Sequence, residues 1–385
     1  MKVPAFFLFS FSAASLIGAN DRCAPESPAT CYPEACDCMY CLGPTNDGVN
    51  APVNPLTCNG DWEITLAGFY WKPHQDGMEY AIESHVENTE DERYRLIDAD
   101  FKNPNFKWDF GFKLGLGYNT TCDGWDFGVL WTWFQGRADS HNEAEDEDNI
   151  TLLTLWSDQT EEIDPGNPLF ATDIETRWKL KLNLIDIALG RKFWNSPRVA
   201  IRPHIGLRIG YIDQDFRIEY KGGTWSDLNG NQVNDEVHLE NDFKGAGLRA
   251  GLDTNWHFGC GWSLYGDFAL SQIYGRFDVD HDEATRDTTP PFEKVKVLES
   301  KNSFRTTTLI VDVGLGVEYA ALFCDCNYGL AVSLGWEQHL FLHQNQMWRV
   351  VPQEGSSTTD INNIYHQRRG DLSTQGWTLK VVFDF

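Results

Sequence analysis

Between its first twenty residues and its last residue, this 385-residue chain lacks any run of about twenty apolar residues. An α-helix needs such a run to cross a lipid bilayer, so internal transmembrane helices are excluded. No linker or break in composition divides residues 61–385, which argues against several separate domains. We therefore expect one large domain in this region, and hydropathy alone would call it soluble.

Positive charge is also scarce. The chain has 31 Lys and Arg against 57 Asp and Glu, a net charge of −26 and a pI near 4.6. This balance argues against nucleic acid as a partner. The acidic runs, such as residues 145–148, are interpreted as solvated loops. Two alternatives are a vestibule that concentrates cations and a divalent-cation seam with surface lipid.

Long alternating segments are the main feature that is present. From Val199 to Tyr211, odd positions are apolar or proline, whereas even positions carry arginine, histidine, alanine and glycine. Side chains alternate between the two faces of a strand. Strands of soluble sandwiches have about five or six residues, whereas a tilted membrane strand needs roughly ten. Charges such as Arg202 would be costly in a dry core but acceptable along a wet lumen.

Ten such segments are predicted. They are residues 61–72, 105–118, 125–137, 173–194, 198–220, 239–257, 261–279, 302–323, 327–345 and 373–385. Short turns alternate with long connections, and the run at 178–189 changes parity near Leu184–Ile185, which predicts a β-bulge. The fold class is all-β, an antiparallel transmembrane β-barrel of the bacterial outer membrane with both termini on the periplasmic side. About ten strands are expected, and up to sixteen if residues 78–84 and 150–157 are barrel strands instead of loop hairpins.

The amino-terminal part is predicted to consist of two segments. Residues 1–19, with Lys2 followed by an apolar run, indicate a signal peptide for export to the outer membrane. Residues 20–60 form a cysteine-rich periplasmic leader, and residues 61–385 form the barrel. No lipobox precedes Cys23, so lipidation is not expected.

All ten cysteines are predicted to face the periplasm, in the leader or at short turns. They are Cys23, Cys31, Cys36, Cys38, Cys41, Cys58, Cys122, Cys260, Cys324 and Cys326. An exported chain meets an oxidising compartment, which favours disulfides. The sequence leaves the disulfide pairing open. The disulfides join the leader to the barrel within one chain, or they join this chain to neighbouring copies or to other cysteine-rich envelope proteins. Metal binding by the closely spaced leader cysteines is the alternative.

Two further patterns resemble functional sites. Asp227, Asn229, Asn231 and Asp235 occupy calcium-loop spacings, but Gln232 replaces the usual glycine and ordinary turn chemistry explains the same residues. No cofactor other than this candidate calcium is expected. Glu337, His339 and His343 share one strand parity with no catalytic signature around them, so we expect no enzyme activity. Inward polar residues occur in any barrel.

Aromatic residues and glycines carry a resemblance to a known family. Trp62, Trp125, Trp262 and Trp377 are predicted to form a girdle at the periplasmic interface. The segments WDFGFKLGLGYN (108–119) and DGWDFGVLWTWF (123–134), with an aromatic last strand, resemble the major outer membrane protein family of Chlamydiae and Legionella. The leader's cysteines look most like the chlamydia-related members. The resemblance implies a porin that is also a disulfide-linked structural component of the envelope.

The leading functional prediction is a porin for passive diffusion of small hydrophilic solutes and ions. Its predicted lumen residues are Lys113, Lys179, Lys181, Arg202, Arg208, Arg249, Asp109, Asp126, Asp253, Asp312 and Glu318. The alternative is a closed-lumen adhesin or envelope scaffold, which a ten-stranded barrel would favour because small barrels fill their interiors. Expected partners are outer-membrane lipid, small solutes and disulfide-linked copies or envelope proteins, and a homo-oligomer is an open alternative.

Overall fold

The computed structural model describes residues 50–56, 61–87, 95–121, 123–144, 149–157, 170–223, 232–323, 327–353 and 362–385. The predicted signal peptide, almost all of the leader and every cysteine except Cys260 lie outside these ranges. Among the described residues, no helix is long and apolar enough to cross a membrane. Cys260 is exposed and lies between two long strands, with a φ of 54°.

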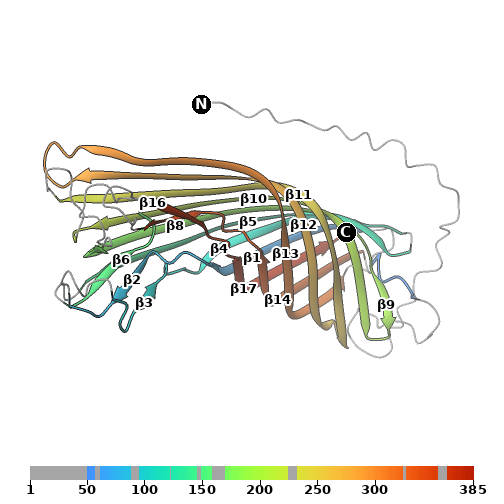
Figure 1. The fold of residues 1–385 in the computed structure, drawn as a ribbon. Coiled ribbons are helices and arrows are strands. Elements are labelled where there is room, and N and C mark those ends of the chain that lie inside the picture. The colour runs from blue at the N-terminus through green and yellow to red at the C-terminus, as the bar shows by residue number, and fades with distance from the viewer. Residues whose placement is uncertain are drawn as a thin grey trace.

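Ten strands close into one antiparallel barrel (Figure 1). They are β1 (Asp61–Gln75), β4 (Asp109–Asn119), β5 (Trp125–Glu143), β8 (Asp173–Arg191), β10 (Val199–Lys221), β11 (Val233–Gly259), β12 (Trp262–Asp287), β13 (Lys294–Phe323), β14 (Tyr328–Phe341) and β17 (Leu372–Asp384). Each pairs with the next along the chain, and β17 pairs with β1 to close the ring. The predicted antiparallel barrel of about ten strands is confirmed.

Apart from β9, the remaining strands lie outside the barrel wall. β2 (Ala81–Ser84), β3 (Asp100–Lys102), β6 (Thr151–Thr154) and β7 (Phe170–Ala171) form a small four-stranded sheet, and β15 (Trp348–Gln353) pairs with β16 (Asn362–Gln367). β9 (Phe193–Ser196) adds to the start of β10. Residues 78–84 and 150–157 therefore contribute to a sheet in the long connections, and the barrel has no strands beyond ten in the described part of the chain.

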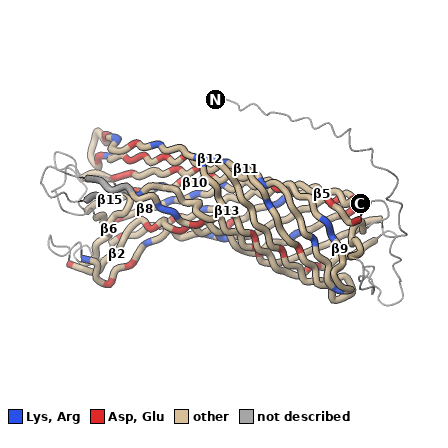
Figure 2. The backbone as a smooth tube through the Cα atoms, turned by 45° about the vertical axis from the view of Figure 1, so that its right-hand side comes forward, with Lys and Arg blue, Asp and Glu red and all other residues tan. Residues whose placement is uncertain are grey.

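The wall consists of two halves with opposite patterns. In the membrane-level half, near the short turns, outward side chains are apolar, as at Ile187 and Leu189 of β8. In the protruding half, near the long connections, outward side chains of the same strand are charged, as at Arg177 and Lys179. β10 to β13 have 23 to 30 residues each, more than twice the roughly ten that a crossing needs. They therefore extend well beyond the length of one membrane crossing, past the outer ends of β14 and β17 (Figure 1), and they carry charged residues there (Figure 2).

The β-bulge predicted near Leu184–Ile185 is absent. β8 pairs with β5 and with β10 in continuous register. Its even residues face inward throughout, so the strand keeps its orientation and only the side-chain chemistry changes. Lipid surrounds the membrane-level half and requires apolar groups outside, whereas water surrounds the protruding half and requires them inside. Lys179 and Lys181, predicted in the lumen, consequently lie exposed on the outer face.

Aromatic side chains form two girdles at the edges of the lipid-facing band. Near the short turns, Trp62 lies against Tyr118, with ring centroids 5.1 Å apart. Near the opposite edge, Tyr70 and Trp108 lie 5.4 Å apart, and Trp377 lies 5.4 Å from Trp336. Trp377 was predicted at the short-turn edge and belongs to the opposite girdle, because it pairs with Tyr70 near the middle of β17. Two such girdles are expected where a barrel meets both interfaces of a membrane.

Candidate functional site

The membrane-level half encloses a cavity of about 350 Å³, lined by the inner faces of the barrel strands. Charged side chains of both signs line it, together with small residues and glycines. Taking ions out of water is costly unless each finds a partner. The pairing of these charges therefore decides whether the lumen holds mobile ions or a fixed network.

One network lies toward the short turns. The guanidinium of Arg202 donates to both carboxylate oxygens of Asp126, at 2.9 Å from Nε and 2.5 Å from Nη2. Its Nη1 donates to Asp253 at 2.7 Å, and Nε2 of His204 lies 3.3 Å from the other oxygen of Asp253. Arg202 lies on β10 and Asp126 on β5, and β8 separates these strands. The pair therefore reaches over an intervening strand.

A second network spans the bore one layer higher. Arg208 donates from Nε and Nη2 to the two oxygens of Asp186, at 2.6 and 2.7 Å, and its Nη1 lies 2.7 Å from Asp312. Two strands, β11 and β12, separate Arg208 on β10 from Asp312 on β13. Nε of Arg249 lies 3.6 Å from Asp312, and Nδ1 of His339 lies 2.7 Å from it. These side chains link opposite parts of the wall.

A third charged group lies against an aromatic ring. Nζ of Lys113, on β4, donates to Glu337 of β14 at 2.7 Å, across the two strands that separate them. The hydroxyl of Thr378 also donates to Glu337 at 2.8 Å, and it accepts from the indole N–H of Trp71 at 3.2 Å. Nζ of Lys113 lies 5.2 Å from the centroid of the Trp71 ring. Trp71 therefore marks the change from the charged lumen to the apolar part of the bore.

Eight of the eleven side chains predicted for the lumen line the cavity. They are Lys113, Arg202, Arg208, Arg249, Asp126, Asp253, Asp312 and Glu318. Lys179 and Lys181 do not, because they belong to the outer face of the protruding half. Asp109 does not either: it accepts from Nε of the exposed Arg137 at 3.2 Å, at the outer end of β4.

Other residues that line the cavity are absent from the predicted set of lumen residues, namely His204, Asp186, Asp267, Glu337, His339 and Lys380. All have the inward parity of their strands, which is the signal that could have found them. For Asp186 the assumed bulge concealed that parity. His343, grouped with Glu337 and His339 in the sequence, lies exposed in the connection after β14.

Above the charged layers, one contiguous core of buried apolar side chains fills the bore. Nine of the ten barrel strands contribute to it. The contributors include Phe69 and Trp71 of β1, Phe134 of β5, Trp178, Leu180, Leu182 and Leu184 of β8, Ile212 and Phe216 of β10, Phe243 of β11, Ile273 and Phe277 of β12, Ile310 of β13, Phe341 of β14 and Leu372 of β17. We call this set the bore core. Close packing of this kind leaves little room for water.

Three long connections fold inward onto the bore core. Met78 and Tyr80 between β1 and β4, Trp156 between β5 and β8, and Met347 between β14 and β17 are each at most 1% exposed. The phenol of Tyr220, an inward residue of β10, donates to the backbone carbonyl of Tyr80 at 2.9 Å. The connections thus form a plug inside the protruding half.

Glu79 joins these connections. Its carboxylate accepts from Arg349 at 3.2 Å and from Arg368 at 3.0 Å. Its backbone carbonyl accepts from Arg349 and from the indole N–H of Trp156, both at 2.7 Å. One residue of the plug is therefore tied to two other connections by charged and neutral hydrogen bonds.

The protruding half also buries ionisable groups. Ser157 donates to Glu283 at 2.5 Å. Asp235, the last residue of the candidate calcium loop, is fully buried on β11, and burial together with nearby Glu283 raises its pKa well above the usual range. The other three candidate ligands, Asp227, Asn229 and Asn231, lie outside the described residues. Burial lowers the pKa of His281 on β12 to about 4.

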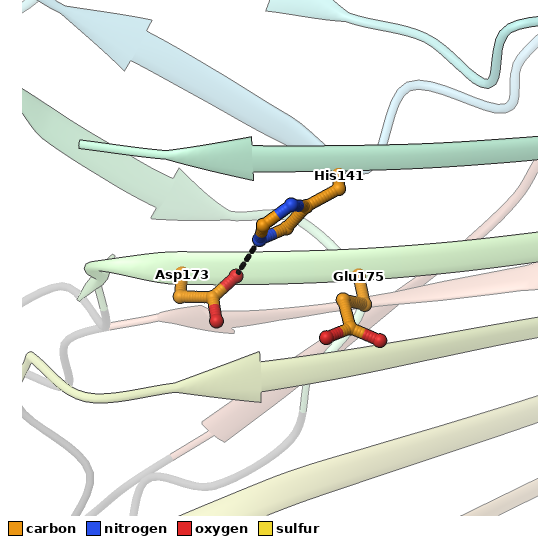
Figure 3. A group of neighbouring side chains, drawn as sticks. All are labelled: His141, Asp173 and Glu175. Atoms are coloured by element: carbon orange, nitrogen blue, oxygen red, sulfur yellow. Dashed lines mark hydrogen bonds and ion pairs between the residues drawn. The ribbon is translucent and has the colours of Figure 1, made fainter. Parts of the chain in front are cut away.

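Two groups of one histidine and two carboxylates lie on the outer face of the protruding half. In Figure 3, His141 of β5 points toward Asp173 of β8, whose oxygen lies 2.8 Å from its Nε2, with Glu175 beside them. Nζ of Lys221 lies 2.6 Å from Glu175 and 3.6 Å from Asp173, so a cation of the protein already balances this group. The second group is Asp215, His238 and Glu240, and Arg217 lies 3.1 Å from Asp215.

Comparison with protein families adds the decisive observation. Residues 55–385 match the family described as Legionella pneumophila major outer membrane protein precursor. The chain belongs to this family. The family and the closed barrel together make it an outer-membrane barrel, with the apolar band of the membrane-level half in lipid.

Solved structures give only distant likeness. The outer membrane protease OmpT of Escherichia coli is 11% identical, covers 86% of this chain and 98% of its own, and has a TM-score of 0.29. Ail, the attachment invasion locus protein of Yersinia pestis, is 11% identical, with coverage of 85% and 100% and a TM-score of 0.23. The toluene transporter TodX of Pseudomonas putida is 10% identical, with coverage of 85% and 89% and a TM-score of 0.27. No curated protein matches the chain. None of these values assigns an activity.

Proposed function

We propose that this protein is a closed-lumen outer-membrane barrel that holds a long acidic protruding half outside the membrane and does not provide steady diffusion. The observation that supports this most directly is the bore core, which fills the barrel above the charged cavity. An ion that passed it would lose its hydration shell in an apolar environment. That transfer is costly enough for apolar constrictions to act as barriers in channels.

The charged lumen supports the same proposal. Arg202, Arg208 and Lys113 each meet a carboxylate from a strand that is not their neighbour. Side chains that are paired across the bore occupy the path of a solute and are held by several hydrogen bonds. We infer that they stabilise a narrow ten-stranded barrel from inside, as expected when the interior is just wide enough for side chains.

Passive diffusion through a porin is the second candidate. It is favoured by the polar cavity of about 350 Å³ at membrane level. In this alternative the plug and the bore core would have to move aside for solute to pass. No catalytic role is proposed for Asp312, His339 and Glu337, because each is engaged in the paired networks.

The direction of insertion and the disulfides belong to the proposal as well. We infer that the short turns face the periplasm, because barrels of this type have short periplasmic turns and long outer loops. Exposed Cys260 would then meet an oxidising compartment. Reducing and non-reducing gels of whole envelopes test crosslinking: a monomer without reductant would exclude disulfide-linked copies or partners.

Solute flux tests the closed lumen. The folded protein is reconstituted into liposomes, and swelling in small sugars is compared with empty liposomes and with a general porin. We expect swelling no faster than in empty liposomes. Swelling that rises with the amount of folded protein and falls with sugar size would support the porin instead.

A further inference from the structure

The barrel wall of the protruding half is open along one edge. β14 ends at Phe341, which pairs with Ile310, whereas β13 continues outward from there to Lys294. Over residues 294–308 the described part of the chain pairs β13 with β12 alone. β13 is therefore an edge strand over about half its length, and an edge strand presents unused backbone donors and acceptors.

The hydrogen bonds of β13 show which residues point to this open edge. The carbonyl of Leu309 accepts from the N–H of Leu342 at 2.9 Å, on the side away from β12. The N–H of Ala320 donates to Gly261 at 2.8 Å, on the β12 side. In an antiparallel strand the N–H and C=O groups of alternate residues point to the same side. Ser303, Arg305 and Thr307 therefore direct their backbone groups away from β12.

A groove lies beside this edge. It has a volume of about 350 Å³ and is lined on one side by Asn302 and residues 304–308 of β13. Trp348 of β15 and Gln367 of β16 line the other side, although neither strand pairs with β13. Phe304 and Trp348 are half-buried against the bore core and give the groove an aromatic floor.

The charge of the groove is opposite to that of the molecule. Within the described part of the chain, its charged or titratable lining consists of Arg305, Arg369 and His343 and contains no acidic residue, in a chain of net charge −26. Among the described residues, neither Arg305 nor Arg369 has an acidic partner; Arg369 reaches only Gln367, at 3.5 Å. A second copy of the β13 edge would bring like charges together, which disfavours it as the occupant.

We propose that this edge binds an extended acidic peptide segment of another protein, which adds as a strand beside β13. The backbone of the peptide would complete the ladder of Ser303, Arg305 and Thr307. Its acidic side chains would meet Arg305, Arg369 and His343, and its apolar side chains would lie on Phe304 and Trp348. Strand addition of this kind takes affinity from backbone bonds and specificity from side-chain pockets. The inference does not depend on whether the lumen conducts.

The probe is a fluorescent decapeptide of alternating glutamate and valine, titrated with the folded full-length protein in detergent and followed by anisotropy. We expect the acidic peptide to bind the unmodified protein saturably. The matching lysine–valine peptide should bind the unmodified protein at least about tenfold more weakly, and so should the acidic peptide bind R305E/R369E. R177E/R217E is the matched control, because both of these arginines are exposed on the outer face of other strands. It should bind the acidic peptide like the unmodified protein.

The backbone contribution has its own test. Thr307→Pro removes a donor from the open edge and leaves the β12 ladder intact, so it should abolish binding. Gel mobility with and without boiling verifies that each variant is folded. As a second route, N-methylation of alternate glutamates or of alternate valines blocks one edge of the peptide at a time, and at least one of these peptides should fail to bind the unmodified protein.

Three results would overturn the assignment. Binding that survives both Thr307→Pro and the two N-methylated peptides would show electrostatic attraction without strand addition. Equal binding of the acidic and basic peptides, or no binding of either, would rule out an acidic peptide as the occupant of this edge. Self-association of the unmodified protein that Thr307→Pro abolishes would assign the edge to a second copy.

Discussion

Leu184 and Ile185 are neighbours on β8, yet Leu184 packs in the bore core whereas Ile185 faces outward at the level of the lipid-facing band. Toward the short turns from this point, apolar residues of β8 face out and Asp186 faces in. Toward the long connections, the inward residues are apolar apart from Thr176, and Lys181 faces out. The outer face of β8 thus passes from lipid to water near Leu184 and Ile185, although the strand itself stays regular. This boundary marks where the barrel leaves the membrane.

A charged side chain on the outer face should therefore cost more folding free energy in the membrane-level half than in the protruding half. Ile187→Lys places an ammonium group in lipid and should destabilise the folded barrel by about 2–4 kcal/mol. Lys179→Ile, eight positions away on the same outward face, should cost less than about 0.5 kcal/mol because that site is exposed to water. Urea unfolding in lipid vesicles measures both. Equal costs for the two substitutions would contradict the boundary at Leu184 and Ile185.

The same boundary explains what the sequence could predict. Alternation with apolar residues on one face identified all ten barrel strands, because lipid imposes that pattern over a full crossing. The pattern inverts above the membrane, so the inversion in β8 resembled a bulge, and the predicted ends of β11, β12 and β13 were too short at the long-loop side. Lys179 and Lys181 were assigned to the lumen for the same reason.

The plug could not be predicted from local pattern. Met78, Trp156 and Met347 are far apart in sequence and are separated by polar loop residues, so their burial depends on the completed barrel. The partners of Glu79 are likewise remote, at Arg349 and Arg368. Contacts of this kind depend on the closure of the barrel. No periodicity along the chain indicates them.

Arg208 should act as a structural residue of the lumen. Arg208→Ala leaves Asp186 and Asp312 buried without their main cation, and removal of one member of a buried pair costs about 3–5 kcal/mol. The triple variant R208M/D186N/D312N removes the charges together and should recover most of the loss. Urea midpoints of refolded protein provide the measurement. A fully stable Arg208→Ala variant would indicate an open, water-filled lumen.

Glu79 should hold the plug. Glu79→Gln removes the carboxylate shared by Arg349 and Arg368 and should loosen residues 76–84 by about 1–3 kcal/mol. Hydrogen exchange of this segment should rise while exchange in the membrane-level strands stays unchanged. Glu83→Gln is the control, because Glu83 pairs only with Lys102 among the described residues of the same connection. Similar exchange in both variants would argue against Glu79 as the junction.

His281 should make the protruding half sensitive to acid. Burial lowers its pKa from the usual 6.5 to about 4, so the folded form binds this proton less readily than the unfolded form. The contribution of neutral His281 to the stability of the folded form is fully present above pH 6.5. It is lost as the pH falls from 6.5 through about 4. Limited proteolysis of the protruding half should therefore accelerate across this interval.

His281→Leu should remove that dependence on pH. Both ring nitrogens of His281 lack a hydrogen-bond partner among the described residues, so the leucine should also stabilise this region at neutral pH by about 1–3 kcal/mol. His238→Leu, at a half-buried position on the outer face where the histidine is paired with Asp215, serves as the comparison. An acid-accelerated cleavage that persists in His281→Leu would assign the effect to another group.

Single-channel conductance in a planar lipid bilayer tests the central claim most directly. The folded protein is compared with a variant that combines Glu79→Gln with Phe216→Ala and Phe277→Ala, which weakens the plug and hollows the bore core. The closed-lumen account predicts no reproducible openings for the unmodified protein and brief openings for the variant. Regular, stepwise openings of the unmodified protein would contradict it and restore passive diffusion as the function.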